Sequence, residues 1–362
     1  MRFVVTGAAG FVGYSLSELL VKRFGVDSVQ AVVGPAPLHE KERARQERLQ
    51  ELGVRTIASD LRECPVLRAA LTDFDVLFHL AAYARTEEDS RDVRINDLGT
   101  ERLIRELGPR LEGARVVYAS SIAAVDAPPG GGRIDMTAPC APKTEYGATK
   151  LAGEEIVKRC AAGLGYRYSI LRLSTVYGPG FRPGGMFDVL AHSLRANGLS
   201  ARICWPGKIS LVGVSDLAEI LLAAATDGRM ADRTFLVSTN EDPSMGAISE
   251  QIARAIGADY RPIRLPHWLM TCLRSSAWPI WQTRFIPHPL RISAWRLSLV
   301  IEGLYADGSE LTSLLNFRYR PWKEEFPAMY ADTAEYGRDS APANASHEYV
   351  RHAYPSAVKI SR

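Results

Sequence analysis

The stretch FVVTGAAGFVG, residues 3–13, decides the fold of this 362-residue chain. Its apolar start predicts a buried strand, and its glycine-rich end predicts a tight turn that leads into a helix. In such a turn Gly7 permits the bend, Gly10 lets the backbone approach a diphosphate, and Gly13 allows close packing of the helix. The free NH groups at the start of that helix attract an anion. The stretch therefore predicts a dinucleotide-binding loop, with a plain glycine-rich turn as the alternative.

Downstream of this loop, short apolar runs alternate with segments of helical pattern. Helices are expected over 14–24, 96–107 and 145–162, and the apolar runs that separate them read VQAVV, VRTIAS, VLFHLAA, ARVVYASS and YSILRLS. Strands that alternate with helices of this length indicate βαβ units and a parallel sheet. The predicted fold is α/β, a Rossmann doubly wound parallel sheet with a smaller, discontinuous C-terminal substrate-binding domain.

The domain boundaries follow from where this pattern loosens. Residues 1–178 are expected to form the dinucleotide-binding domain, and 205–240, which contain a further strand and helix pattern, to return to it. The substrate-binding portion is expected to consist of 179–204 and 241–335. Residues 336–362 are rich in small and polar side chains, which predicts a poorly ordered tail.

The composition is that of an ordinary globular protein. It is 46% hydrophobic, and 44 basic against 41 acidic residues give a formal charge of +3. The charges are spread along the chain, so nucleic acid is not expected as a partner, and the mixed run at 39–51 predicts a solvated helix face. The five cysteines are odd in number and lack metal-ligand spacing, which favours a reducing compartment, packing roles and no metal site.

The sequence predicts neither a signal peptide at its N-terminus nor a membrane span. Met1 leads directly into a strand without a signal-peptide pattern, so a cytoplasmic location is expected. The segment 265–301 holds four of the six tryptophans, but Arg and Pro interrupt it too often for a membrane span. A wall of the substrate pocket is the favoured interpretation of this segment, and a peripheral membrane contact is the alternative.

Tyr146 and Lys150 suggest the chemistry of the site. Their spacing in YGATK is one helical turn, which places the phenol and the ammonium on one face. A nearby cation lowers the pKa of a phenol from about 10 toward working pH, so that it can transfer a proton. Ser121 ends the strand-like VVYASS, where its hydroxyl can orient a reacting oxygen, and Ser120 is the fallback. Together these residues predict proton and hydride chemistry.

Two further strand ends are candidates for contact with a dinucleotide. Asp60, in ASDL, is expected at the carboxyl edge of the sheet, where it can accept a hydrogen bond from an adenine amino group. The alternative for Asp60 is a helix N-cap. Leu80, Ala81 and Ala82 end another strand, and the small side chains there leave room for the cofactor to cross.

These motifs resemble a known family. The chain is similar to extended short-chain dehydrogenases/reductases of the NAD-dependent epimerase/dehydratase family in TGAAGFVG, DL at 60, LAA at 80, NDLGT at 96, YASS at 118, YGATK at 146, RLSTVYGPG at 172 and VSDLAE at 214. The motifs occur in the family's order over the first 225 residues. The resemblance implies that Tyr146 is the acid/base, that Lys150 binds the nicotinamide ribose and tunes the tyrosine, and that Ser121 orients the substrate oxygen.

The residues and the resemblance together define an expected site. Asn96 is expected to contact the cofactor or support a proton relay, with a helix N-cap as the alternative, and the family's habit is a homodimer. The expected substrate contacts are Tyr83, Ser121 and Thr175. The expected cofactor contacts are Gly7, Ala9, Gly10, Phe11, Val12, Gly13, Asp60, Leu61, Leu80, Ala81, Ala82, Asn96, Tyr146, Lys150, Leu173 and Val176.

Several departures from the family pattern affect the choice of cofactor and substrate. The second strand, VQAVVGPAP, lacks the acidic residue that holds a ribose 2′-hydroxyl, and no Arg follows it to hold a 2′-phosphate, so NAD and NADP both stay open, with NAD favoured. Thr175 stands where sugar-nucleotide enzymes of the family carry Asn, and the Thr-Asp-Glu of the dehydratases is absent. The Trp-rich segment and the closing LNFRYRPW are more similar to the branch of the 3β-hydroxysteroid dehydrogenases, which handle apolar alcohols and ketones.

The favoured hypothesis is an NAD(P)-dependent oxidoreductase that interconverts a secondary alcohol and a ketone. The first alternative is a sugar-nucleotide epimerase with tightly bound NAD. The second is a non-catalytic regulator that binds a dinucleotide, which the intact Ser121, Tyr146 and Lys150 disfavour because a sensor has no use for an activated phenol.

Overall fold

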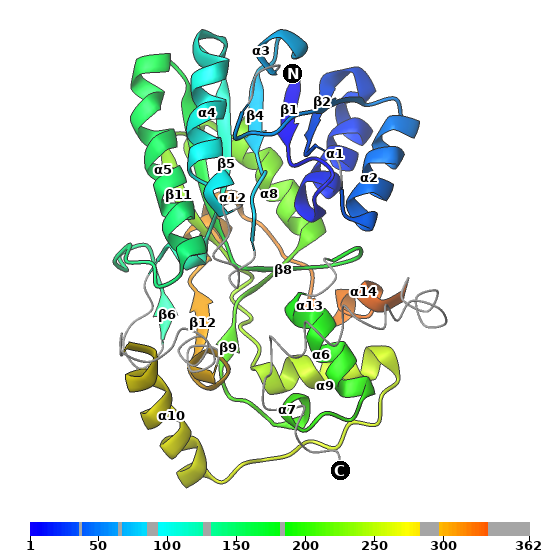
Figure 1. Ribbon diagram of the computed structural model, residues 1–362, viewed down its shortest axis with the longest axis vertical. Helices are drawn as coiled ribbons and strands as arrows, with labels where there is room; N and C mark the ends of the chain where they lie inside the picture. The colour runs from blue at the N-terminus through cyan, green and yellow to red at the C-terminus, as the bar shows by residue number, and fades with distance from the viewer. Residues whose placement is uncertain are drawn as a thin grey trace.

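A seven-stranded parallel sheet forms the upper part of the molecule (Figure 1). The computed structural model describes residues 1–35, 38–63, 67–84, 93–125, 132–181, 185–282 and 297–331. The strand order is β11-β7-β5-β4-β1-β2-β3, which confirms the predicted doubly wound α/β fold. The strands are β1 (Phe3–Thr6), β2 (Val29–Val33), β3 (Arg55–Ala58), β4 (Val76–His79), β5 (Arg115–Ser121), β7 (Arg167–Leu173) and β11 (Arg233–Val237).

Helices cover both faces of this sheet because alternate strand residues point to opposite faces. Val5 of β1 packs in the apolar cluster that contains α1 and α8, whereas its neighbour Val4 packs in the cluster of α3, α4 and α5. The helices concerned are α1 (Phe11–Phe24), α2 (Glu40–Glu51), α3 (Leu67–Ala70), α4 (Leu98–Leu107), α5 (Glu145–Leu164) and α8 (Val214–Thr226). The chain proceeds outward from β1 to β3 and then in the other direction from β4, so the crevice of this fold opens between β1 and β4.

The predicted helices exist, with shifted ends. The helix expected over 14–24 already begins at Phe11, because the glycines of the turn obscure its first helical residues in the sequence pattern. The helix expected over 96–107 begins at Leu98, where the Asp97 side chain accepts a hydrogen bond from the Leu98 NH. The helix expected over 145–162 continues to Leu164.

Most of the remaining elements lie below the sheet (Figure 1). β8 pairs with β10, and β12 pairs with both β6 and β9, so two small sheets extend the large one. Their strands are β6 (Arg133–Ile134), β8 (Thr175–Tyr177), β9 (Lys208–Ile209), β10 (Leu211–Gly213) and β12 (Gly303–Ala306). The helices here are α6 (Met186–Arg195), α7 (Leu199–Arg202), α9 (Met245–Ile256), α10 (His267–Gln282), α13 (Trp322–Glu325) and α14 (Ala328–Ala331). Helix α12 (Ser309–Leu315) instead packs in the core of the large sheet together with β11. Five 3-10 turns complete the described elements: η1 (Val26–Ser28), η2 (Val93–Ile95), η3 (Gly108–Leu111), η4 (Ile122–Ala124) and η5 (Gly228–Met230).

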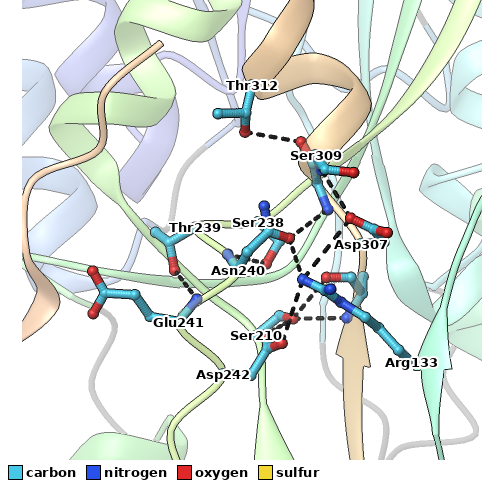
Figure 2. A network of polar contacts seen from close by, with 12 residues as sticks. Arg133, Ser210, Ser238, Thr239, Asn240, Glu241, Asp242, Asp307, Ser309 and Thr312 are labelled. Atoms are coloured by element: carbon cyan, nitrogen blue, oxygen red, sulfur yellow. Dashed lines mark hydrogen bonds and ion pairs between the residues drawn. The ribbon is translucent and has the colours of Figure 1, made fainter.

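A polar network joins the small sheet to the loop after β11 (Figure 2). An Arg133 amino group of β6 donates to Asn240 Oδ1 at 2.6 Å and lies 3.8 Å from an Asp242 carboxylate oxygen. Ser210 Oγ donates to Asp242 at 2.6 Å and accepts from the Ala306 NH of β12 at 2.7 Å. These contacts hold the lower part of the molecule against the end of the large sheet.

The run 39–51 forms the helix α2, whose charged side chains are mostly exposed as expected, and Leu49 is the residue of this helix that is buried. One sequence interpretation needs correction. Cys140 and Cys272 are exposed, so packing does not explain them. In the Trp-rich segment Trp268 is 67% exposed, so this side chain does not fill the core, and the pocket-wall interpretation stays a prediction.

The other expectations about these segments fall partly outside the described residues. Cys64, residues 283–296 and the tail 336–362 are not described, nor are the side chains of Trp278 and Trp281. Among the helices that are described, none is long and apolar enough to cross a membrane.

Candidate active site

The glycine-rich turn between β1 and α1 is a cradle that no larger residue could form. Gly7 has a φ of +70°, and a Cβ on it would lie 2.8 Å from the Ala81 backbone. A Cβ on Gly13 would lie 2.2 Å from the Gly7 carbonyl oxygen. No side chain caps the start of α1, and its first turn carries no acidic residue, so the helix presents its backbone NH groups to an anion. The cradle therefore fits a diphosphate.

The end of β4 is fastened to this turn by Thr6. The Thr6 hydroxyl accepts from the NH groups of Leu80 and Ala81 at 3.2 and 3.3 Å. Leu80 is partly buried, and Ala82 is exposed at the same edge.

His79 is a buried, neutral side chain between the hydroxyls of Thr6 and Thr100. Its ring nitrogens lie 2.8 Å from the hydroxyls of Thr6 and Thr100. Burial, and secondarily the charge of Lys150, lower the pKa of His79 to about 3. An imidazole that stays neutral at physiological pH positions its neighbours and does not exchange protons there.

A pocket of about 100 Å³ opens at the carboxyl ends of β2 and β3. It brings together four of the residues expected to contact the cofactor, Gly7, Asp60, Leu61 and Ala81. The other lining residues are Val32, Val33, Gly34, Pro35, Ser59, Arg62 and Ile95. The pocket's place at the end of parallel strands and its apolar walls suit a planar base.

Asp60 stays charged at the rim of this pocket. The Arg62 guanidinium donates to both carboxylate oxygens of Asp60, at 2.7 Å to the nearer one, and holds its pKa below the ordinary value. The Arg62 NH also bonds the carboxylate at 2.9 Å, so Asp60 caps a turn. Residues 61–63 form a turn and not a helix, so the helix N-cap alternative for Asp60 is wrong.

Helix α5 places Tyr146 near the end of β5. Thr144 Oγ1 accepts from the Gly147 NH at 3.0 Å and caps the helix, so Tyr146 lies in its first turn. A Cβ on Gly147 would lie 2.1 Å from the Ala123 carbonyl oxygen, so α5 and the turn after Ser121 touch through a glycine. Burial raises the pKa of Tyr146, and its hydrogen bond with Ser121 acts in the opposite direction. The structure therefore unites the predicted phenol and hydroxyl.

Ser120 points to a different partner. Its hydroxyl donates to Glu154 at 2.5 Å, and both side chains are buried. Arg172 donates to the same carboxylate at 2.9 and 2.8 Å. Because Glu154 and Arg172 engage Ser120, its hydroxyl already has a partner within the protein, and Ser121 stays the predicted substrate-orienting serine.

Lys150 is almost fully buried, at 1% exposure. Its ammonium lies 4.2 Å from the centroid of the Tyr118 ring, a cation–π contact that the sequence did not indicate. Burial lowers the pKa of Lys150 to about 7, while Glu154, one helical turn further along, acts to raise it. Lys150 is thus a buried amine whose charge changes near neutral pH, as functional lysines often do.

We expect Lys150→Met to raise the free energy of unfolding by a few kcal/mol at about pH 6, because it removes a buried cation. The folded-state pKa of about 7 lies below the ordinary 10.5. The free-energy cost of burying the Lys150 charge is therefore present in full below pH 7, and it disappears as the pH rises from 7 toward 10.5. Urea unfolding across this range should show a gain that shrinks with pH. Lys22→Met, at an exposed position of α1, is the control, and a Lys150→Met protein less stable than wild type at pH 6 contradicts the interpretation.

Asn96 supports the site through protein contacts. Its side chain accepts from the Tyr83 NH at 2.9 Å and donates to the Tyr83 carbonyl at 3.0 Å. It also donates to Thr149 Oγ1 at 3.2 Å, which in turn donates to the Tyr146 carbonyl at 3.0 Å. Asp97 caps α4, so the N-cap alternative for Asn96 is wrong.

The other predicted residues lie along the same edge. Leu173 pairs with Ser121 in the β5–β7 ladder, and Thr175 and Val176 are half-buried in β8. Sequence reasoning missed Glu154 and Arg172. The signal for Glu154 was its position one helical turn after Lys150, but only the fold shows that its carboxylate is buried.

Comparison with known proteins adds the family. Residues 3–237 match the NAD dependent epimerase/dehydratase family. The chain is 27% identical over 319 residues to sterol demethylase protein B of Methylococcus capsulatus, which covers 85% of this chain and 91% of that protein. It is 30% identical over 278 residues to UDP-glucose 4-epimerase of Mycolicibacterium smegmatis, covering 72% and 85%. Matches to four other epimerases span between 41% and 61% of those proteins.

A solved structure shares the fold. The UDP-glucose 4-epimerase of Thermus thermophilus, in complex with NAD, superposes with a TM-score of 0.70 at 22% identity. The superposition covers 94% of this chain and 100% of that one. The resemblance drawn from the motifs is confirmed.

Proposed function

This chain belongs to the NAD-dependent epimerase/dehydratase family, and from that premise we propose that it interconverts a secondary alcohol and a ketone with NAD. It is an enzyme of the extended short-chain dehydrogenase/reductase type. The observation that carries the proposal is that the fold places Tyr146, in the first turn of α5, against the turn that follows Ser121, with the buried Lys150 one helical turn further along.

The described residues fit a nicotinamide dinucleotide. Gly7, Gly10 and Gly13, with the NH groups of α1, would hold the diphosphate. Asp60 and the pocket around it would hold the adenine. Lys150 would bind the nicotinamide ribose, and Leu173 and Val176 would flank the nicotinamide. NAD supplies the hydride acceptor when bound.

Side chains of the protein itself bind the alcohol and transfer its hydroxyl proton. Ser121 Oγ would orient the alcohol oxygen, and Tyr146 would accept the hydroxyl proton as the alcohol is oxidised to the ketone, with the bound cofactor as the hydride acceptor. In the reverse direction Tyr146 returns the proton. The Thr149 and Gly147 contacts fix the first turn of α5, so the phenol is held where the proton is transferred.

An apolar alcohol is the favoured substrate class. One support is the relative named for sterol demethylation, because the match covers 91% of the length of that protein. The other is Thr175, which stands where sugar-nucleotide enzymes of the family carry an asparagine. The match to UDP-glucose 4-epimerase supports the second candidate, an epimerase with tightly held NAD. The homodimer that the family resemblance implies stays a prediction.

Gly13→Ala is expected to weaken NAD binding by at least about tenfold, because its Cβ would lie 2.2 Å from the Gly7 carbonyl and displace the cradle. Calorimetry with NAD, NADH, NADP and NADPH measures this, after absorbance and mass spectrometry have shown whether a cofactor copurifies. Gly163→Ala in α5 is the matched control, since its Cβ would meet nothing within 4 Å. Wild-type affinity in Gly13→Ala would remove the basis for a dinucleotide on this turn. A freely exchanging cofactor supports the dehydrogenase, whereas a trapped one supports the epimerase.

A further inference from the structure

Helix α10 lacks the buried face on which a helix of a globular protein usually depends. Its side chains are described over residues 267–276, and within that range none is buried. Leu269, Met270 and Leu273 are half-buried, and the other side chains in this range are exposed. A helix gains most of its stability from packing one face against another surface. The described part of α10 therefore leaves a face that a further surface can cover.

The protein presents this helix as a projection at its lower end (Figure 1). In that view α10 lies apart from α6, α7 and α9. The chain that enters α10 is fixed, because Ile263 forms a parallel bridge with Ile203 and its NH donates to the Arg202 carbonyl at 2.8 Å. Arg274 Nε donates to Glu302 at 3.0 Å, which joins the helix to the segment before β12. The fold thus holds the exposed face of α10 in place.

The exposed face of α10 carries a tryptophan among small, uncharged side chains. Trp268 is 67% exposed, and Cys272, one helical turn later, is exposed on the same side. Thr271, Ser275 and Ser276 are exposed as well. An indole combines an apolar ring with one polar NH, and tryptophan is for that reason enriched at the boundary between a bilayer and water. This face therefore suits that boundary.

The charges around this face have one sign. Between Asp259 and Glu302 the sequence contains six arginines and four tryptophans, but no lysine and no acidic residue. The whole chain is nearly balanced, with 44 basic against 41 acidic residues, so the bias is local. Arg264 is exposed just before α10, and the Arg274 side chain on α10 is 52% exposed. Arginines beside an exposed aromatic ring complement anionic lipid headgroups.

The spacing of the arginines decides between the kinds of partner. Arg264, Arg274 and Arg284 follow one another at intervals of ten positions, with apolar and aromatic residues between them. These interruptions are too frequent for a membrane span, so the contact is with the surface of a bilayer, and the helix lies in its plane. A nucleic acid would need basic residues concentrated on one face, which this spacing does not provide.

We propose that α10 docks on the surface of a bilayer that contains anionic phospholipids. The Trp268 ring would enter the headgroup region, and Arg264 and Arg274 would attract the lipid phosphates. Docking would bring the substrate-binding portion next to the phase in which apolar alcohols dissolve. The inference goes beyond the proposed function, because docking requires neither NAD nor turnover. The α10 surface is defined by the described residues Arg264, Trp268, Thr271, Cys272, Arg274, Ser275 and Ser276.

Cosedimentation of the full-length protein with vesicles tests this proposal. Vesicles of phosphatidylcholine alone are compared with vesicles of an equal mixture of phosphatidylcholine and phosphatidylglycerol. Wild type should bind the anionic vesicles more tightly, and high salt should weaken this binding because it screens the charges. Arg264→Gln should weaken it by about fivefold, the contribution of one arginine near an anionic surface. Trp268→Ser should weaken it by about tenfold, because the apolar ring no longer leaves water.

The matched controls lie on α2 and directly after it, in the upper part of the molecule (Figure 1). The Arg48 side chain is 59% exposed, and Leu52 is 37% exposed. Arg48→Gln and Leu52→Ser should bind both kinds of vesicle as wild type does. Arg264→Lys, which keeps the charge, should also match wild type. Each substitution changes an exposed side chain, so all of these proteins should unfold at the wild-type temperature.

Three results would overturn the proposal. The first is a wild-type protein that does not sediment with the anionic vesicles. The second is wild-type binding by both Trp268→Ser and Arg264→Gln, which would place the contact elsewhere. The third is a lipid-free dimer, measured by light scattering, that Trp268→Ser converts to a monomer, because the α10 surface would then cover a second copy. A wild-type protein that binds vesicles but no NAD would contradict the proposed function and leave this inference standing.

Discussion

Tyr146→Phe is expected to lower turnover by about 10²- to 10⁴-fold, because it removes the group that accepts the alcohol proton and nothing else. The ring stays in the first turn of α5, where the cap at Thr144 and the contact at Gly147 hold the backbone. NAD affinity should therefore stay within about twofold of wild type. Steady-state rates and calorimetry on the same preparation separate the two effects.

The matched control is Tyr168→Phe, a half-buried tyrosine near the amino end of β7 and so at the opposite edge of the sheet. It should keep wild-type turnover. Full turnover in Tyr146→Phe would assign the proton to another group and dismiss the proposed chemistry. A parallel loss of NAD affinity would instead mean that the phenol serves binding.

Glu154→Ala is expected to destabilise the protein by about 3–5 kcal/mol, because it leaves the Arg172 guanidinium buried and unpaired. The side chains of Arg172 and Glu154 are 5% and 0% exposed, and Ser120 and Lys158 also contact the carboxylate. Urea unfolding measures the loss. The double variant Glu154→Leu/Arg172→Leu should recover part of it, since it removes the buried guanidinium together with its carboxylate partner.

The control for this ion pair is an exposed one. Glu250 and Arg254 are 49% and 68% exposed on α9, and Glu250→Ala should cost no more than about 1 kcal/mol. A Glu154→Ala protein that loses no more than this exposed control would contradict a structural role for the buried pair.

The parts of the account that sequence predicted correctly depend on local spacing. The glycines between 7 and 13 require a tight turn between a strand and a helix, and Tyr146 and Lys150 are one turn apart on any helix. Such patterns contain their geometry within a few residues. For that reason the fold class, the family and the neighbourhood of the phenol could be inferred without coordinates.

The parts that sequence could not predict depend on long-range packing. The partner of Ser120 lies 34 positions away on α5, and the ring beneath Lys150 is that of Tyr118 on β5. Asn96 binds the backbone of Tyr83 because η2 and the end of β4 meet in space, which no motif records. That the buried Ser59 hydroxyl has no hydrogen-bond partner among the described residues follows only from the positions of all its neighbours in the fold.

The measurement that tests the central claim most directly follows net reduction of the cofactor. Wild-type enzyme with NAD is incubated with a panel of apolar secondary alcohols, 3β-hydroxysteroids among them, and with UDP-sugars, while near-ultraviolet absorbance reports reduced nicotinamide and mass spectrometry reports products. The account predicts that one alcohol yields its ketone and reduced nicotinamide in equal amounts, and that Tyr146→Phe abolishes both. Inversion of a UDP-sugar carbon with no accumulation of reduced nicotinamide would contradict it and establish an epimerase.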